Sequence, residues 1–398
     1  MDELVNWILE EGRNSDDLGA IFKGVSERLV AQGIPLFRTN LGMPTIEPTA
    51  ALLRFEWSRD RGLASDALSP EDSYGPEFQR SPIFYLIERN LVRERWNLED
   101  PEVVRRFALF EDLRALGVTE YALRFIRFSQ GRTALRGAAL SMATDRRGGF
   151  TEDEIAAVGR ILPALSIVAY RIGLSRVAVE TLGAYLGPQT GAHVMQGMIR
   201  RGDSQVISAA LLLADLRGFT ALVDANPGTE VVGWLNQHLE CIGDAVTERG
   251  GEVLKFLGDG LLAVFPSDRI GAEQACREAL RAAVDAGGRN AALNARRTDE
   301  GGPRLDLTIA LHFGDVIYGN IGTARRLDFT VVGPAVNEVS RMEALGKALG
   351  AELLLSESIA HRCGHPVLSL GTHKLRGTTG MREMFALDLS SGAEVTPR

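Results

Sequence analysis

The sequence predicts an α+β fold of two domains joined by a helical connector, and three observations support this. A chain of 398 residues with 45% hydrophobic content is long enough for two separate cores. Strand and helix patterns alternate through the C-terminal half. Between the two halves of the chain, the Gly- and Pro-containing stretch of residues 186–204 interrupts a long helical pattern. We therefore expect a first domain over 1–150, a connector over 151–190 and a second domain over 191–398.

Residues 1–150 combine helical and strand patterns. Apolar residues recur at helical spacing in LVNWILEEG and DDLGAIFKGVSERLVAQG, whereas TAALLRFEWSRD, TEYALRFIRFSQG and TALRGAALSMATD favour strands. The Pro- and Ser-rich stretch of residues 64–84 predicts a surface loop. Most aromatic side chains here are expected in the core, although some could line a ligand pocket: Phe55, Trp57, Phe84, Tyr85, Trp96, Phe107, Phe110, Phe125 and Phe128.

The connector begins with a helix-start pattern. Thr151 followed by Glu154 is a capping box, and the apolar pattern then continues to about residue 186, with a kink or break expected at Pro163. The order of helix, strands, hairpin and closing helix resembles a GAF-type sensor domain. That resemblance implies a regulatory domain with an unknown small-molecule or protein input.

Composition excludes several classes of function. The net charge of −8, without a basic run, argues against a nucleic-acid partner. The uncharged apolar stretches are short for a membrane span, and the acidic N-terminus lacks the basic start of a signal peptide, so a cytoplasmic protein is expected. All histidines and cysteines lie beyond residue 190, which excludes a haem or zinc held by them in the first half. The cysteines have no disulfide framework spacing: Cys241, Cys276 and Cys363.

The C-terminal half has a regular order of elements: strand, helix, hairpin, helix and strand, which is a ferredoxin-like order. The expected strands lie at 206–215, 252–257, 260–265, 305–313, 316–321, 327–332 and 352–356, followed by a final strand pair. The expected helices lie at 227–249, 269–296 and 334–349.

Two strands in this half end in aspartate. Asp215 follows the apolar run ISAALLLA, and Asp259 lies in the bend Leu-Gly-Asp-Gly. Each alone would be explained by turn capping. Two carboxylates at neighbouring strand ends, however, suit a pair of divalent cations, which can clamp the attacking and leaving oxygens in phosphoryl transfer. The turn Gly218-Phe219-Thr220 opens a helix whose free N–H groups suit a polyphosphate.

A third segment, LDFTVVGPAVNEVSRMEAL, places Asn337 and Arg341 four residues apart on one helical face. The three segments in this order resemble the class III nucleotidyl cyclases, the adenylate and guanylate cyclases. The resemblance implies that Asp215 and Asp259, with the Leu216 carbonyl, hold two Mg²⁺ or Mn²⁺ ions. It also implies that Asn337 orients the ribose and that Arg341 meets charge developing on the α-phosphate.

The same resemblance indicates which residues contact the base and which contact the terminal phosphates. Lys255 and Thr330 are the base-selecting positions, and a lysine donates to adenine N1, which is an acceptor, whereas guanine carries a donor there. Asp328 is a rival for contact with the adenine amino group. In HKLRGTTG, Arg376 is the first candidate for the terminal phosphates and Lys374 the second.

In this family the metal aspartates and the base and phosphate residues come from opposite subunits, which implies a homodimer with two sites. We therefore expect an adenylate cyclase that converts ATP to 3′,5′-cyclic AMP and pyrophosphate. The alternatives are a guanylate cyclase and a nucleotide-binding regulatory module without turnover. A diguanylate cyclase would need a Gly-Gly-Asp/Glu-Glu-Phe turn where LGDG stands.

Overall fold

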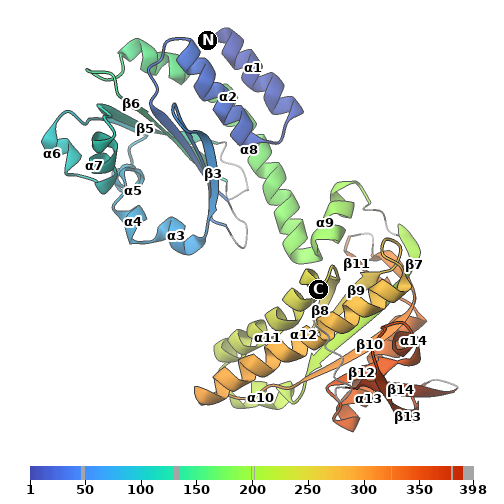
Figure 1. Ribbon diagram of the computed structural model, residues 1–398. Helices are drawn as coiled ribbons and strands as arrows, with labels where there is room; N and C mark the ends of the chain where they lie inside the picture. Colours follow the sequence, from blue (N-terminus) through green and yellow to red (C-terminus); the bar gives the residue numbers. More distant parts are fainter. Residues whose placement is uncertain are drawn as a thin grey trace. The chain divides into compact units, whose positions relative to one another are not determined.

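The chain forms two compact units, Met1–Ala184 and Tyr185–Arg398. They are seen in a computed structural model (Figure 1) that describes residues 1–45, 50–128, 135–198, 200, 202–323, 325–377 and 380–388. Both units combine helices with one β-sheet, so the predicted α+β class is confirmed.

The N-terminal unit is built on a six-stranded antiparallel sheet with the order β3-β2-β1-β6-β5-β4. Its strands are β1 Arg38–Pro44, β2 Leu52–Ser58, β3 Gly62–Leu68, β4 Arg93–Asn97, β5 Glu120–Arg127 and β6 Gly137–Thr144. Alternate residues of each strand face opposite sides of the sheet. The two faces are covered differently.

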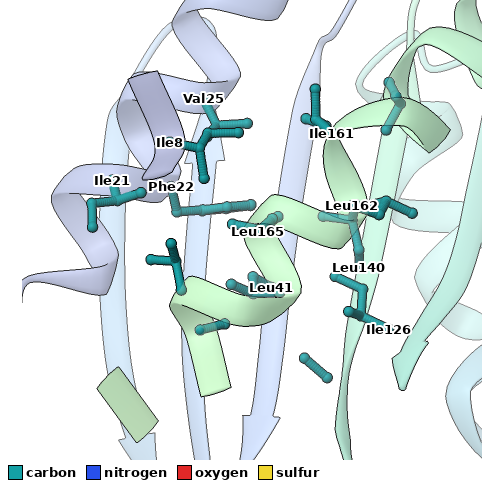
Figure 2. Packing of buried hydrophobic residues seen from close by; sticks show 14 of the residues in the cluster. Ile8, Ile21, Phe22, Val25, Leu41, Ile126, Leu140, Ile161, Leu162 and Leu165 are labelled. Atoms are coloured by element: carbon teal, nitrogen blue, oxygen red, sulfur yellow. The ribbon is translucent and has the colours of Figure 1, made fainter. Parts of the chain in front are cut away.

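One face packs against α1 (Asp2–Asn14), α2 (Leu18–Ala31) and α8 (Glu152–Leu186). Figure 2 shows side chains of these helices meeting side chains of β1, β5 and β6 in a shared apolar core. Phe22, Leu41 and Leu165 are fully or almost fully buried there. Burial of such side chains is the main stabilising contribution to this unit.

Short helices cover the other face: α3 Pro70–Tyr74, α4 Pro76–Gln79, α5 Pro82–Glu88, α6 Pro101–Val104 and α7 Ala108–Ala115. The prediction of a surface loop over residues 64–84 was therefore wrong. The prolines of this stretch occupy first helical positions, where a missing N–H costs nothing. The hydroxyls of Ser69 and Ser81 cap two of these helices by accepting from the N–H groups of Asp72 and Phe84, each at 3.2 Å.

The connector helix α8 begins with the predicted capping box. The Thr151 N–H donates to Glu154 Oε2 at 2.8 Å, and the Glu154 N–H donates to Thr151 Oγ1 at 3.3 Å. The helix runs for 35 residues without a break at Pro163. By length and composition α8 could cross a membrane, but 50% of its most apolar window is buried in the protein, as in an ordinary core helix.

The C-terminal unit contains an eight-stranded sheet with the order β13-β14-β12-β10-β7-β9-β8, and β11 pairs with β10. Its strands are β7 Ser204–Leu216, β8 Glu252–Leu257, β9 Gly260–Pro266, β10 Leu307–Gly322, β11 Leu327–Val332, β12 Leu353–Ser356, β13 Val367–Lys374 and β14 Met381–Leu387. The central order β10-β7-β9-β8 is the ferredoxin-like arrangement. The two strands expected at 305–313 and 316–321 are one continuous strand, β10.

The helices of this unit are α9 Pro188–Met195, α10 Phe219–Ala225, α11 Gly228–Glu248, α12 Ala272–Asp299, α13 Pro334–Leu349 and α14 Glu357–Ala360. Helices α11 and α12 lie side by side over one face of the sheet (Figure 1), and Leu212 and Ala214 of β7 face them. Leu211 and Leu213 belong to the core on the other face, together with residues of α13. Asp215, two residues after Leu213, therefore lies on the face that α13 covers.

A buried polar network joins α11 to α12. The ring of His238 contacts Asn290 through Nδ1, and Arg297 Nη1 donates to His238 Nε2 at 2.7 Å. Arg297 Nη2 also donates to Gln237 Oε1 at 2.6 Å. Burial lowers the pKa of His238 to about 4, so its ring is neutral and can accept from the guanidinium.

Candidate active site

The two aspartates predicted from the strand ends lie together. Asp215 of β7 is paired with Gly260 of β9, and Asp259 precedes Gly260 in the turn after β8. A Cβ atom at position 260 would lie 2.4 Å from the Ala214 carbonyl oxygen and 2.9 Å from Asp215 Oδ1. Glycine is therefore required for this turn to approach β7. Burial and the neighbouring Asp215 carboxylate raise the pKa of Asp259.

A lysine of α13 supplies positive charge at this carboxylate pair. Lys347 Nζ forms an ion pair with Asp215 and a second, at 3.0 Å, with Glu343 one helical turn earlier. Burial opposes the charge of Lys347, but its bonds to the two carboxylates outweigh burial and raise its pKa. Burial also raises the pKa of Glu343, against the effect of Lys347. Sequence analysis missed both residues, although a Glu-to-Lys pair at i, i+4 was a visible signal.

Arg217 fixes the end of α13 against the end of β7. Its Nε donates to Thr308 Oγ1 at 2.7 Å, and its Nη2 donates to the Ala351 carbonyl at 2.6 Å, just beyond the helix. The intervening Leu216 is buried, and its N–H donates to Asp215 Oδ1 at 3.1 Å. These bonds hold the carboxylate, the Leu216 backbone and the last turn of α13 in one arrangement.

The predicted phosphate turn opens the short helix α10. Gly218 has a φ of 72°, the left-handed region that favours glycine, and α10 begins at Phe219 without a side-chain cap. Thr220 is exposed in the first turn. The N-cap of α10 thus makes no side-chain hydrogen bond to the first N–H groups of the helix, and their role as a phosphate site stays a prediction.

The base-selecting candidates also lie together. Lys255 Nζ of β8 donates to Asp328 Oδ2 of β11 at 2.9 Å. Thr330, two residues further along β11, is only 4% exposed, and its Oγ1 has no hydrogen-bond partner among the described residues. Asp328, the predicted rival of Thr330 for the adenine amino group, thus pairs with Lys255.

Asn337 and Arg341 lie on another face of α13. At 3.6 residues per turn, they point about 120° away from Glu343 and Lys347. Asn337 is exposed, and Arg341 is half-buried beside the turn between β13 and β14, where a Cβ atom on Gly377 would lie 3.4 Å from Arg341 Nη2. The exposed Arg376 adjoins this turn. The aspartate pair and the Asn/Arg pair thus face in different directions within one chain.

The donor set suits hard cations that keep water and phosphate as further ligands, because such ions need few carboxylates. Among the residues that the structure describes, no group of three or more His, Cys, Asp or Glu side chains is arranged to hold a metal ion. Asp215 and Asp259 nevertheless lie together, and the ammonium of Lys347 already pairs with Asp215. The two carboxylates therefore favour a positive charge at this point.

Residues 203–387 match the family described as adenylate and guanylate cyclase catalytic domain. This part of the chain therefore belongs to the class III nucleotidyl cyclase catalytic domains. The match lies in the C-terminal unit, so the GAF-type resemblance of residues 1–150 stays a prediction.

Among curated proteins, an adenylate cyclase of Anabaena cylindrica is 32% identical over 168 residues, which cover 42% of this chain and 33% of that protein. Adenylate cyclase 1 of Rhizobium meliloti is 29% identical over 179 residues, covering 44% and 26%. The chain thus spans about a third or less of the length of these relatives. The solved adenylyl cyclase CyaB from P. aeruginosa is 21% identical, with a TM-score of 0.44 over 47% of this chain and 96% of that chain.

Proposed function

We propose that this chain is an adenylate cyclase that converts ATP to 3′,5′-cyclic AMP and pyrophosphate. The observation that supports adenine over guanine is the Lys255–Asp328 pair beside the buried Thr330 hydroxyl. A lysine held in place by a carboxylate donates to an acceptor, and adenine N1 is an acceptor. Asp328 can at the same time accept from the adenine amino group, and the Thr330 hydroxyl has no competing partner in the part of the chain that the structure describes. Two curated relatives that bear the name adenylate cyclase agree with this choice.

Two Mg²⁺ or Mn²⁺ ions are proposed at Asp215 and Asp259, with the Leu216 carbonyl as a further ligand. Bound there, they would activate the 3′-hydroxyl and neutralise the phosphates. The carboxylates are held for this role by the Gly260 turn and by the Arg217 bonds to Thr308 of β10 and to Ala351 just beyond α13.

The remaining residues are proposed to bind and orient the nucleotide. Asn337 would hydrogen-bond the ribose, and the guanidinium fork of Arg341 would bind charge on the α-phosphate. Arg376 would contact the terminal phosphates. The free N–H groups of the turn over 218–220 would bind further phosphate oxygens.

We propose that each site lies between two copies of the chain. Lys347, which pairs with Asp215 of the metal set, and the Asn/Arg pair face different directions on α13, so a second copy in head-to-tail arrangement would bring the two sets to one nucleotide. Phe256 and Leu257, exposed apolar side chains directly before the Asp259 turn, support an interface at this position.

The N-terminal unit is proposed to regulate turnover through α8 and α9. In the C-terminal unit, Glu252 Oε1 accepts from the Thr190 N–H and hydroxyl of α9, each at 2.9 Å, and Glu252 Oε2 accepts from the Tyr318 hydroxyl at 2.8 Å. Glu252 lies on β8, three residues before Lys255. Movement of α9, which follows α8 in the chain, would therefore act on the strand that carries the base-selecting lysine.

The test is product formation by the purified full chain with ATP or GTP and either metal ion. We expect cyclic AMP as the main product, and no turnover by Asp215→Asn or Asp259→Asn. Asp268→Asn, an exposed aspartate after β9, is the matched control and should keep parental activity. Faster turnover of GTP would support the guanylate alternative. Nucleotide binding without product would support the regulatory module.

A further inference from the structure

The N-terminal unit contains a cavity of about 590 Å³ between its sheet and the short helices α3, α4, α5 and α7. Ligand sites of small molecules have volumes in this range. The cavity exists because one face of the sheet carries small residues. Gly42 of β1 stands opposite Ala139 of β6, and Ser141 and Ala143 follow on the same face. The opposite face carries Leu and Met at the alternate positions and forms the core of Figure 2.

The walls are apolar and incompletely packed. Tyr74 and Ile87, from α3 and α5, line the cavity but remain 56% and 53% exposed. Phe78 stacks edge-on against Tyr74 with ring centroids 5.7 Å apart. Large apolar side chains that line a concave surface and remain exposed are typical of a site that an apolar ligand completes.

The charges around the cavity have one sign. Its described lining contains no Asp or Glu side chain but includes four arginines: Arg38, Arg54, Arg127 and Arg136. Arg38 is paired with Glu56, and Arg54 with Asp66, both outside the lining. Within the described residues, the guanidinium groups of Arg127 and Arg136 make no ion pair. Free guanidinium groups at the rim of an apolar cavity favour a carboxylate or a phosphate.

The cavity has two polar regions, Tyr121 with Ser141 and Arg127 with Arg136, and they lie at opposite ends. Tyr121, whose hydroxyl hydrogen-bonds with Ser141, lies six residues before Arg127 on β5, a distance of about 20 Å along an extended strand. The cavity floor between them is formed by Leu123 and Phe125 of β5 and by Ala139. An occupant must therefore be elongated, apolar along its body and charged at one end.

We propose that this cavity binds an elongated, mainly apolar molecule with one terminal anionic group, a carboxylate or a phosphate, which Arg127 and Arg136 hold. The inference depends on no property of the C-terminal unit. The proposal is therefore tested by ligand binding and not by cyclase activity. A cavity that binds no ligand would leave the proposed function unaffected.

The test is calorimetric titration of the full chain with dodecanoate and dodecyl phosphate below their micelle concentrations, and with dodecanol below its solubility limit. The two anions should bind, and the alcohol should bind about tenfold more weakly or worse. The anion that binds with the higher affinity identifies the preferred head group. The double variant Arg127→Gln/Arg136→Gln should lose about tenfold for the anions and leave the alcohol unchanged.

A filling variant tests the cavity itself. A Cβ atom at Gly42 meets only Leu52 Cδ1, at 3.7 Å, so Gly42→Leu fits the strand while its side chain enters the cavity. It should abolish binding of all three probes, with folding verified by circular dichroism. Arg93→Gln, an exposed arginine of β4 outside the lining, is the matched control. The proposal is overturned if no probe binds, if the alcohol equals the anions, or if either cavity variant binds like the parent.

Discussion

Replacing Lys347 by glutamine should make the enzyme easier to activate by metal and, without metal, less stable. The ammonium of Lys347 pairs with Asp215, so a metal ion at the proposed site would have to compete with it for that carboxylate. Removing the ammonium removes the competitor. It also leaves Asp215 and Asp259 side by side without their counter-charge, which costs stability until a metal binds.

The size of both effects follows from exposure. The side chains of Lys347 and Asp215 are 36% and 22% exposed, so the pair is only partly screened by solvent. A pair in this setting is worth about 1 kcal/mol, at the upper end of surface ion pairs. One kcal/mol corresponds to about a fivefold change in an equilibrium constant. The Mg²⁺ concentration for half-maximal activity should fall about fivefold, and the melting temperature in EDTA should fall by about 2–4 °C.

The assay is cyclic AMP formation over a series of free Mg²⁺ concentrations at saturating ATP, with thermal unfolding in EDTA as the second measurement. Lys23→Gln, which breaks an i, i+4 pair with Glu27 on α2, is the control and should change neither. A half-maximal Mg²⁺ concentration that stays constant or rises in Lys347→Gln would show that the lysine assists the metal site and does not compete for it.

Further outcomes are expected from the rest of the molecule. Asp215→Asn and Arg341→Ala homodimers should each be inactive, and mixing them under proven subunit exchange should restore activity; a mixture as inactive as its parents would rule out a shared site. Because His238 has a folded pKa of about 4 against 6.5 unfolded, its contribution to stability is complete above pH 6.5 and is lost as the pH falls towards 4. The parent should lose up to about 3 kcal/mol over that range by urea unfolding; His238→Gln should lose less, and exposed His361→Gln the same as the parent. Glu252→Ala should lower the free energy of unfolding by about 2–3 kcal/mol, because three donors lose their acceptor. The urea midpoint should fall accordingly.

The C-terminal elements could be predicted because their patterns are local. An apolar run that ends in Asp215 and a helix with Asn337 and Arg341 at i, i+4 are visible within about ten residues each. The Lys347–Asp215 pair joins positions 132 residues apart, and no local pattern specifies such a contact. The same holds for Arg217, whose guanidinium reaches backbone carbonyls beyond α13.

The N-terminal misreading has a different cause. Proline and serine between residues 64 and 84 are consistent with either a loop or successive helix starts, and composition alone does not separate the two. The distinguishing signal was position, because each proline that begins a helix directly follows Ser69, Gly75 or Ser81. The cavity could not be predicted from the sequence either, since it depends on Gly42 and Ala139, small residues from strands that are paired only in the folded sheet.

The central position of β7 has a consequence for synthesis of the protein. β7 is buried on both faces, yet its partner β10 is made about ninety residues later. At ribosomal speeds of about 5–20 residues per second, the apolar run that ends in Asp215 waits about 5–20 s for that partner. Its other partner, β9, is made partway through this interval. Asp215 and Asp259 can therefore come together before β10 is made, whereas the core closes only with β10, and slower synthesis would prolong the exposure of an aggregation-prone strand.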